Sequence, residues 1–381
     1  MLLKTRLKVR NKSVAVLDIR SSEVCAAVGE RGVNNTFIIK SKYSCAYDGY
    51  ADGELLDFDS FKAAVQDVVQ STLAASGQKI YRFYVGIPGE FVRVKVTDDA
   101  ITFQSPQRIR RAHTDGVAAM SQPDDGEGYA VVDSSVVYYV LSDKRRVIDP
   151  EGCISDSLRA RICWFLCKQS FCECVKLAFR PFSSVSRLKF IPSALAQCNY
   201  LLERQARDSY AALLDIGYIS SVYSVACGNG ILFSQAFSMG VGHIAVLLMD
   251  ELGIPFEVAS QFLSKVNLNA KERLTSVQEI KYGEKVYRYS TAQLRDIIRE
   301  GLDGLCELVD ECRRSFSEKD MSGKPLNITG EGVKTIRGTA EHLAGRLECE
   351  VEVITPKVPY YDKPKFSSLF SLLDGALGEN E

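Results

Sequence analysis

At 381 residues the chain is too long for one simple hydrophobic core, and roughly two to four domains of ~100–200 residues are expected. Its hydrophobic content of 46% and charged content of 25% are ordinary for a soluble globular protein, and the formal net charge of −1 gives no overall field that would favour nucleic acid. No stretch approaches the ~18 uncharged apolar residues of a membrane-spanning helix. Lys4 interrupts the start, where a secretory signal would be apolar, so the sequence predicts a cytoplasmic protein.

The first predicted elements follow the strand-then-helix pattern of an α/β domain. The strands are residues 14–17, 24–28, 37–40 and 81–86, and the helix covers 58–75, with Gly77 as its expected end. The first two strands enclose Asp18, Arg20, Ser21 and Ser22. An apolar strand that ends in an acid and turns straight back is typical of a strand–turn–strand hairpin.

From residue 87 to about 166 the pattern changes. Short strands over 91–96, 131–132 and 136–141 alternate with turns, and the sizeable polar loop 122–128 lies among them. This stretch is predicted to be an α+β insertion within the first half of the chain.

The twelve cysteines are expected to remain reduced in a protein without an export signal. The densest group is Cys153, Cys163, Cys167, Cys172 and Cys174. Its spacing matches no zinc-binding pattern, and Cys163 and Cys167 are spaced by one helical turn among apolar residues. Buried small side chains are the favoured interpretation, and a structural metal site is the alternative. No catalytic nucleophile or paired metal-ligand motif stands out, so no catalytic residue is predicted.

A second hairpin, residues 211–222, repeats the first one. Its apolar run ends at Asp215, and Gly217, Ser220 and Ser221 precede the return to apolar residues. Two such hairpins facing each other across a cleft could hold the phosphates of a nucleotide through their hydroxyls and amides, with Asp18 and Asp215 holding a hydrated Mg²⁺. Aspartate also forms turns without any ligand, which leaves a purely local role open for both carboxylates.

The rest of the second half is mainly helical. The predicted elements are helices over 241–314 interrupted by a strand pair near 282–289, a strand over 326–329, a helix over 335–347, a strand over 351–354 and an amphipathic helix over 366–377. Gly330 and Gly332 follow the strand at 326–329 and suit a strand-to-helix turn.

In their order and spacing, several segments resemble the bacterial cell-division family FtsA of the actin-like ATPase superfamily. These segments are the Asp18 hairpin, Val85-Gly86-Ile87-Pro88-Gly89, Phe237-Ser238-Met239-Gly240-Val241-Gly242-His243-Ile244, Ile328-Thr329-Gly330-Glu331-Gly332 and residues 365–373. The resemblance implies an α/β protein with an actin-like ATPase fold, in which two duplicated ribonuclease-H-like domains carry a small α+β insertion in the first half. The implied divisions are 1–86 and 167–207 for the first subdomain, 87–166 for the insertion, 208–250 and 317–381 for the second subdomain, and 251–316 for a helical upper subdomain. The terminal helix is expected to return to the first subdomain.

The resemblance also implies a function. FtsA-like proteins are adaptors that self-associate into filaments and bind the tubulin-like protein FtsZ, or another division component, at the inner face of the cell membrane at midcell. ATP and Mg²⁺ would be the cofactors. The implied nucleotide contacts are Asp18, Arg20, Ser21, Ser22, Asp215, Gly217, Ser220, Ser221, Gly330 and Gly332, with Asp18 and Asp215 holding Mg²⁺ through water.

Departures from the family pattern predict a weakened or lost nucleotide site. Arg20 replaces a glycine, and the second hairpin has Tyr218, Ile219 and Val222 where the family has glycines and, last, an aspartate. A β-branched residue such as Ile219 resists the positive φ that a phosphate loop uses, and the ring of Tyr218 would project toward the phosphates. The alternatives are an ATP-binding filament protein with intact switching and an adaptor of a membrane-associated assembly, like PilM.

Arg20 allows three interpretations. Its guanidinium could contact a phosphate, it could pair with Asp18 and Asp215 in place of Mg²⁺, or it could turn to solvent. Near the N-terminus, five alternating cations could contact anionic lipid or an acidic partner, or form the wet face of an edge strand. They are Lys4, Arg6, Lys8, Arg10 and Lys12. The terminal helix could mimic a membrane anchor, but its family position favours packing into the core.

Overall fold

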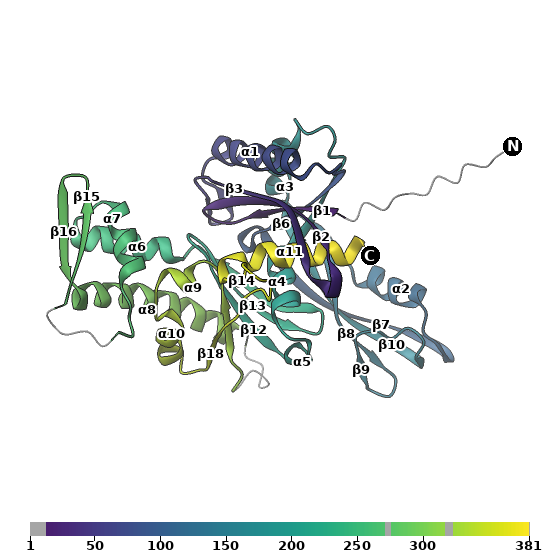
Figure 1. Ribbon diagram of the computed structural model, residues 1–381. Coiled ribbons are helices and arrows are strands. Elements are labelled where there is room, and N and C mark those ends of the chain that lie inside the picture. The colour runs from purple at the N-terminus through teal and green to yellow at the C-terminus, as the bar shows by residue number, and fades with distance from the viewer. Residues whose placement is uncertain (1–12, 271–275, 317–322, 381) are drawn as a thin grey trace.

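The computed structural model describes residues 13–270, 276–316 and 323–380 (Figure 1). The alternating cations of residues 4–12 lie outside these ranges. Among the residues described, no helix is both long enough and apolar enough to cross a bilayer.

The first half is built on a five-stranded sheet in the order β11-β6-β1-β2-β3. Its strands are β1 Ser13–Ile19, β2 Glu23–Arg31, β3 Phe37–Ala46, β6 Arg82–Ile87 and β11 Arg187–Pro192. All seven residues of β1 are buried because helices cover both faces of the sheet. Alternate residues of β1 therefore point to different cores: Leu17 packs toward α1 (Phe58–Ser76) and α3 (Gln169–Phe179), and Val16 toward α11 (Ser367–Asn380).

Local signals fix the ends of α1. The Asp57 side chain accepts hydrogen bonds from the backbone N–H groups of Asp59 and Ser60, which caps the N-terminus. Gly77 ends the helix in the left-handed conformation at φ 61°, as predicted. The opposite face of the sheet carries α4 (Ser193–Leu201) and α11, which runs back from the second half in yellow in Figure 1.

The second half repeats this plan. Its sheet has the order β14-β13-β12-β17-β18, with β12 Ala211–Ile216, β13 Ser221–Cys227, β14 Gly230–Phe237, β17 Leu326–Thr329 and β18 Val351–Val353. In both sheets the first three strands form an antiparallel meander, and two later strands join parallel to the first one. The two sheets therefore share the same strand order and the same strand directions, as expected for the duplicated domains that the sequence predicts.

Helices and one hairpin complete the second half. They are α5 Arg204–Arg207, α6 Val241–Leu252, α7 Phe256–Lys265, β15 Val277–Tyr282, β16 Lys285–Ser290, α8 Thr291–Ser315, α9 Gly332–Thr335 and α10 Thr339–Leu347. In the described part of the predicted helical region there are thus three helices, with a hairpin between the second and third. α6, α7, β15 and β16 lie together at the left end of Figure 1.

The stretch between β6 and α3 forms a separate sheet in the order β7-β10-β8-β9, accompanied by α2. Its elements are β7 Val92–Arg108, α2 Arg111–Ser121, β8 Tyr129–Leu141, β9 Arg146–Val147 and β10 Ile154–Lys168. The prediction of short strands was wrong, because charged residues on the exposed positions of β7 hide a strand of 17 residues. The helix that the spacing of Cys163 and Cys167 suggested is also wrong, because both residues lie in the strand β10.

The terminal helix α11 packs into the core. Leu369, Phe370, Leu372 and Leu373 are buried, and the helix lies against α4 and β1. The Phe370 ring makes an edge contact with Phe37 of β3 at 5.4 Å. The prediction from the family position is therefore confirmed.

Candidate functional site

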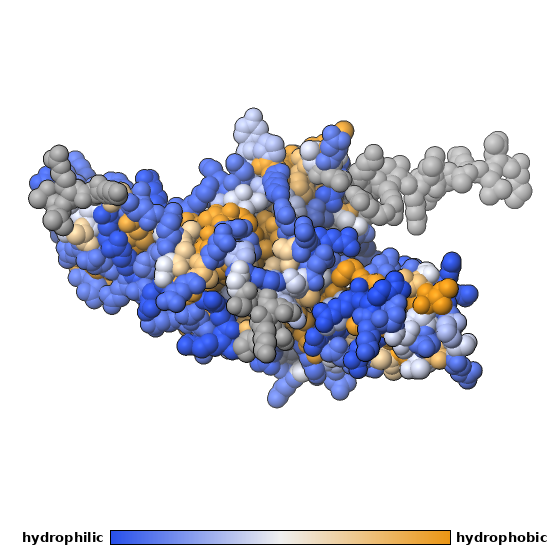
Figure 2. All heavy atoms as spheres, turned by 90° about the horizontal axis from the view of Figure 1, so that it is seen from below, coloured by the Kyte–Doolittle hydropathy of each residue, from blue (hydrophilic) through white to orange (hydrophobic). Residues whose placement is uncertain are grey.

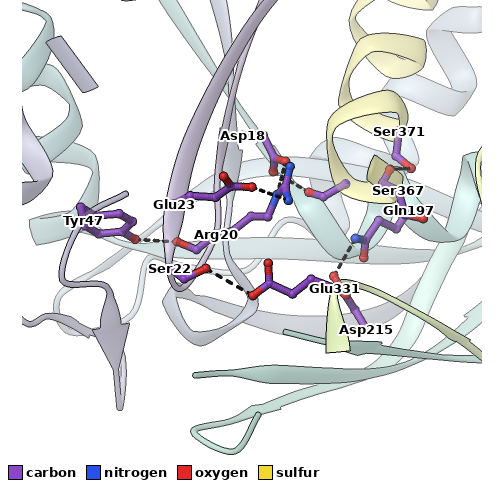
Figure 3. A network of polar contacts seen from close by, with 11 residues as sticks. Asp18, Arg20, Ser22, Glu23, Tyr47, Gln197, Asp215, Glu331, Ser367 and Ser371 are labelled. Carbon is purple, nitrogen blue, oxygen red and sulfur yellow. Dashed lines mark hydrogen bonds and ion pairs between the residues drawn. The ribbon is translucent and has the colours of Figure 1, made fainter. Parts of the chain in front are cut away.

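The turns of the two hairpins face each other between the two sheets (Figure 3). β1 and β2 enclose residues 20–22, and β12 and β13 enclose 217–220. The cavity between the turns is lined by Arg20, Asp215 and Gly330, among others, and holds only about 60 Å³. That is room for a few water molecules, whereas small-molecule pockets commonly span ~300–1,000 Å³.

Arg20 forms an ion pair inside the first hairpin. Its Nε lies 2.9 Å from Asp18 Oδ2, and one terminal nitrogen lies 2.9 Å from Glu23 Oε1. The Arg20 side chain is 15% exposed and that of Asp18 is 0% exposed. Burial acts to lower the pKa of Arg20, but the carboxylates of Asp18 and Glu23 together raise it, so the guanidinium stays charged.

This geometry decides between the three interpretations of Arg20. Its side chain pairs with Asp18, as in the second interpretation, but the other partner is Glu23 and not Asp215. The remaining Asp18 oxygen, Oδ1, accepts a hydrogen bond of 2.6 Å from Ser368 of α11. Both oxygens of the Asp18 carboxylate are therefore engaged by protein groups.

Asp215 is held separately. Its Oδ2 accepts a hydrogen bond of 2.7 Å from Gln197 Nε2 on α4. Burial raises the pKa of Asp215; the Gln197 hydrogen bond opposes this shift and the nearby Asp18 carboxylate adds to it. Gly330, at φ +97°, lies so close that a Cβ atom there would come within 2.2 Å of Asp215 Oδ1. Because these two segments of the chain approach so closely, residue 330 has to be a glycine.

Hydrogen bonds join the two halves directly at the turns. The backbone N–H of Ile219 donates to Ser21 Oγ at 3.0 Å, and Ser22 Oγ donates to Glu331 Oε1 at 3.2 Å. The Ile219 side chain reaches the first half at Gly49, just after β3, where a Cβ would meet its Cδ1 at 2.7 Å. The hydroxyls expected to bind phosphate are therefore used to bind the other half of the chain.

The second turn does not use the strained backbone that the sequence suggested. Residues 217–220 all have negative φ, so the expected resistance of Ile219 to a left-handed conformation does not apply. The Gly217 N–H donates to the Ser220 carbonyl at 3.1 Å, which closes the turn locally. The Tyr218 ring lies against Gly242 at the start of α6, away from the cavity between the turns.

The other expected hydroxyls and glycines have separate surroundings. Ser221 Oγ donates to the Met239 carbonyl at 2.6 Å. Ser220 Oγ is buried without a hydrogen-bond partner among the described residues, as is Ser193 Oγ, and both residues line the cavity. Gly332 begins the short helix α9 and packs against Ile216.

This donor set does not fit a magnesium-bound triphosphate in the described arrangement. The Asp18 carboxylate is neutralised by Arg20, Ser21 and Ser22 are used between the halves, and Glu331 adds a negative charge beside them. Burial raises the pKa of Glu331, and nearby Arg20 opposes that shift. Among the described residues, no cluster of three or more histidine, cysteine or acidic side chains could hold a metal ion.

A second, open hollow of about 680 Å³ adjoins the cavity and shares Glu331, Pro364 and Lys365 with it. Tyr218 lines one side, and the exposed residues Lys334, Lys363 and Lys365 line another. None of these three lysines forms an ion pair with another described residue. Three lysines against the two acidic residues Glu23 and Glu331 give this hollow a net positive lining.

Several important residues were not found from the sequence. Gln197 and Ser368 donate hydrogen bonds to the two aspartates, and Glu23 is the second carboxylate that pairs with Arg20, although all three lie outside the two turns. Tyr47 fixes the first turn by donating from its hydroxyl to the Arg20 carbonyl at 2.7 Å. A polar residue on a buried helix face was the available signal for Gln197, and Ser368 lies among the buried serines Ser367 and Ser371 of α11.

Known proteins give similarity at two levels. No family model matches the chain. In sequence, it is 21% identical over 376 residues to the cell division protein FtsA of Staphylococcus epidermidis, which covers 96% of this chain and 79% of the relative.

Solved structures show the fold. The type IV pilus biogenesis complex PilM–PilN matches with a TM-score of 0.63 and 15% identity, covering 97% of this chain and 99% of that one. MreB5 of Spiroplasma citri bound to AMPPNP matches with a TM-score of 0.58 and 9% identity, covering 97% and 98%. The chain therefore has the actin-like ATPase fold, and the fold class predicted from the sequence is confirmed.

Proposed function

We propose that this protein is an FtsA-like adaptor that self-associates and binds a partner in a division or cytoskeletal assembly, with its nucleotide cleft closed by its own side chains. The sequence similarity to FtsA and the actin-like fold support the broad class. A cytoplasmic protein acting at the inner face of the membrane, with FtsZ or another division component as partner, is the specific form of this proposal.

One observation carries the proposal. The hydroxyl of Ser21 binds the backbone of Ile219 across the cleft, in the position where a phosphate group would have to separate the two turns. Catalysis of phosphoryl transfer depends on accurate placement of donors and metal around the phosphates. A chain whose donors and carboxylates bind one another has its function in its surfaces and not in hydrolysis.

The surface offers contact sites for a partner. The face seen in Figure 2 is largely hydrophilic, and apolar side chains gather near its middle. Elsewhere large apolar residues stand in solvent, such as Val33 at 82% and Tyr360 at 93% exposure. Single exposed apolar residues are ordinary on a protein surface, so the gathered apolar side chains are the feature that favours a partner contact.

Isothermal titration with Mg-ATP tests the closed cleft. We expect no heat of binding in the micromolar range, with MreB5 of Spiroplasma citri as the positive control because its structure holds AMPPNP. Sedimentation at increasing protein concentration should show self-association that is the same with and without Mg-ATP. Micromolar binding of ATP together with rapid phosphate release would overturn the proposal.

The second candidate is an ATP-binding filament protein, and the cationic hollow favours it. Lys334, Lys363 and Lys365 form no ion pair with another described residue, although Lys365 lies over the Phe366 ring at 5.0 Å, and Ser193 and Ser220 keep unpartnered hydroxyls in the adjoining cavity. This candidate predicts Mg-ATP binding that is weakened in Lys365→Ala, and polymers that appear only with ATP. Exposed Lys95→Ala on β7 is the matched control.

A PilM-like role in another membrane-associated assembly is the third candidate, supported by the similarity to the PilM–PilN complex. Fluorescent tagging in the native cell separates it from a division role. Bands at midcell support division, whereas polar or uniform signal supports a different assembly.

A further inference from the structure

Two cysteines touch where the chain leaves the inserted sheet. Cys167 is the second-last residue of β10, and Cys172 lies in the first turn of α3. Their Sγ atoms are 3.4 Å apart, and the Cys172 thiol donates to Cys167 Sγ. All twelve cysteines are free thiols, and no other pair of described cysteines has such a contact.

The surroundings hold this pair in place. Phe171, next to Cys172, stacks on Phe91 at 4.3 Å, and Phe91 lies where the chain enters the inserted sheet. Lys168, next to Cys167, donates to the carbonyl of Gly53 at 3.0 Å and so ties the exit to the first half. The two thiols therefore lie at the connection between the insertion and the first sheet.

Access to solvent differs between the two sulfurs. Cys167 is 0% exposed and Cys172 is 9% exposed, so a small oxidant reaches Cys172 first. Metal binding is not an explanation for the contact, because no third ligand stands with the pair among the described residues. Simple core packing explains burial, but it does not require that the two sulfurs lie within hydrogen-bond distance.

We propose that Cys167 and Cys172 form a reversible disulfide when a hydroperoxide oxidises Cys172, and that this bond locks the exit of the insertion against the first half. The Cys172 thiolate attacks the terminal peroxide oxygen and the O–O bond breaks, which gives a sulfenic acid. The leaving group is hydroxide from hydrogen peroxide or an alkoxide from an organic hydroperoxide, and it takes up the proton that the Cys172 thiol released to become water or an alcohol. Cys167 then attacks the Cys172 sulfur, the S–O bond breaks, and the oxygen leaves as water. With hydrogen peroxide, two thiols and one peroxide give one disulfide and two waters.

The electrostatics agree with this order of events. When Cys172 ionises, a hydrogen bond from the Cys167 thiol to its thiolate lowers the pKa of Cys172; burial opposes the shift, and the positive charge of Lys176 assists it. The same hydrogen bond and burial raise the pKa of Cys167. The more exposed sulfur is therefore also the one that ionises first, as a peroxide-reactive thiol requires.

Peptide mapping after peroxide treatment tests the proposal on the full chain. Trypsin cleaves after Arg161, Lys168 and Lys176, so a Cys167–Cys172 disulfide joins peptide 162–168 to peptide 169–176. We expect this linked pair, lighter by two hydrogen atoms than the two separate peptides, after oxidation and quenching of free thiols with N-ethylmaleimide. Dithiothreitol should abolish the link.

Four single-residue variants identify which two cysteines form the disulfide. Cys163→Ser and Cys174→Ser are matched controls on the same two peptides, and the link should persist in both. Cys172→Ser should abolish the link, and Cys167→Ser should leave a sulfenic acid at Cys172 that dimedone labels. If the wild type forms no linked peptides, or if the link survives in Cys167→Ser, the proposal is wrong.

Hydrogen exchange measures the mechanical consequence. Oxidation should slow amide exchange in the last residues of β10 and in α3 of the wild type, and it should leave exchange in Cys172→Ser unchanged. Equal exchange in oxidised and reduced wild type would contradict the proposed lock even if the disulfide forms.

Discussion

The backbone N–H of Ile219 donates a hydrogen bond of 3.0 Å to the hydroxyl of Ser21, although 198 residues separate them. Each residue lies at the tip of one hairpin, and the two hairpins belong to the duplicated halves. A phosphate group between these tips would have to break this contact. The bond therefore joins the two halves at the cavity between the turns.

Ser21→Ala is expected to weaken this junction. The variant leaves the Ile219 N–H without its acceptor, and the loss of one such bond costs about 1 kcal/mol of unfolding free energy. Urea unfolding followed by circular dichroism measures the change. Ser264→Ala is the control, because the Ser264 hydroxyl is exposed and bonds only to the Gln261 carbonyl of its own helix. Equal midpoints for the wild type and both variants would show that the junction adds nothing to stability.

Arg20→Met is expected to destabilise the fold more strongly. It leaves the fully buried Asp18 carboxylate without its cation, and the removal of one partner of a buried ion pair costs about 3 kcal/mol. Thermal unfolding should show this loss, and the double variant Arg20→Met with Asp18→Asn should recover part of it. Mg-ATP binding should not appear in Arg20→Met. An unchanged melting temperature would mean that the pair is not a structural substitute for a metal ion.

The fold was predictable where the pattern of apolar residues is strong. The α1 prediction of 58–75 differs from Phe58–Ser76 by one residue, because its apolar face is periodic and Gly77 ends it. The inserted sheet was less predictable. The strand β7 alternates charged and apolar positions through Arg93, Lys95 and Asp99, so a single sequence suggests several short strands.

The candidate site was predictable only in part. The hairpins provide a clear pattern, and both carboxylates lie at the cavity or directly beside it. The pairing of Ser21 with Ile219, and of Asp18 with Ser368 across 350 residues, depends on how the halves pack. Such contacts leave no local signal, because a serine in a turn looks the same whether it binds a phosphate or a backbone amide.

The variant Phe370→Ala tests whether α11 acts as a core helix or as a membrane anchor. Phe370 is fully buried beside Phe37 and Tyr361, and a large-to-small change at such a position costs about 3–5 kcal/mol. We expect a large loss of stability in urea, with no change in sedimentation with vesicles of anionic lipid. Leu56→Ala, at a residue that is 59% exposed, should leave stability nearly unchanged. A stable Phe370→Ala protein that no longer binds vesicles would instead identify α11 as an anchor.

The raised pKa values of Asp215 and Glu331 predict a pH dependence of stability. For both groups burial is the main cause of the rise above the ordinary values of 3.8 and 4.5. The folded state therefore holds protons that the unfolded state has already released, so stability falls as the pH rises from the ordinary pKa values through the raised ones. Below the ordinary pKa values, both carboxyl groups are protonated in the folded and the unfolded state, and their contribution to stability is fully present.

The double variant Asp215→Asn with Glu331→Gln removes both titrations. Subtracting its unfolding free energy from that of the wild type cancels the groups that the two proteins share. The difference should favour the wild type most at about pH 4 and decline as the pH is raised toward neutrality, where the ionised carboxylates of Asp215 and Glu331 are buried and repel each other. Urea unfolding at intervals between these limits measures the slope. A difference that is flat, or that rises with pH, would mean that the two carboxylates are as easily ionised in the folded chain as in the unfolded one.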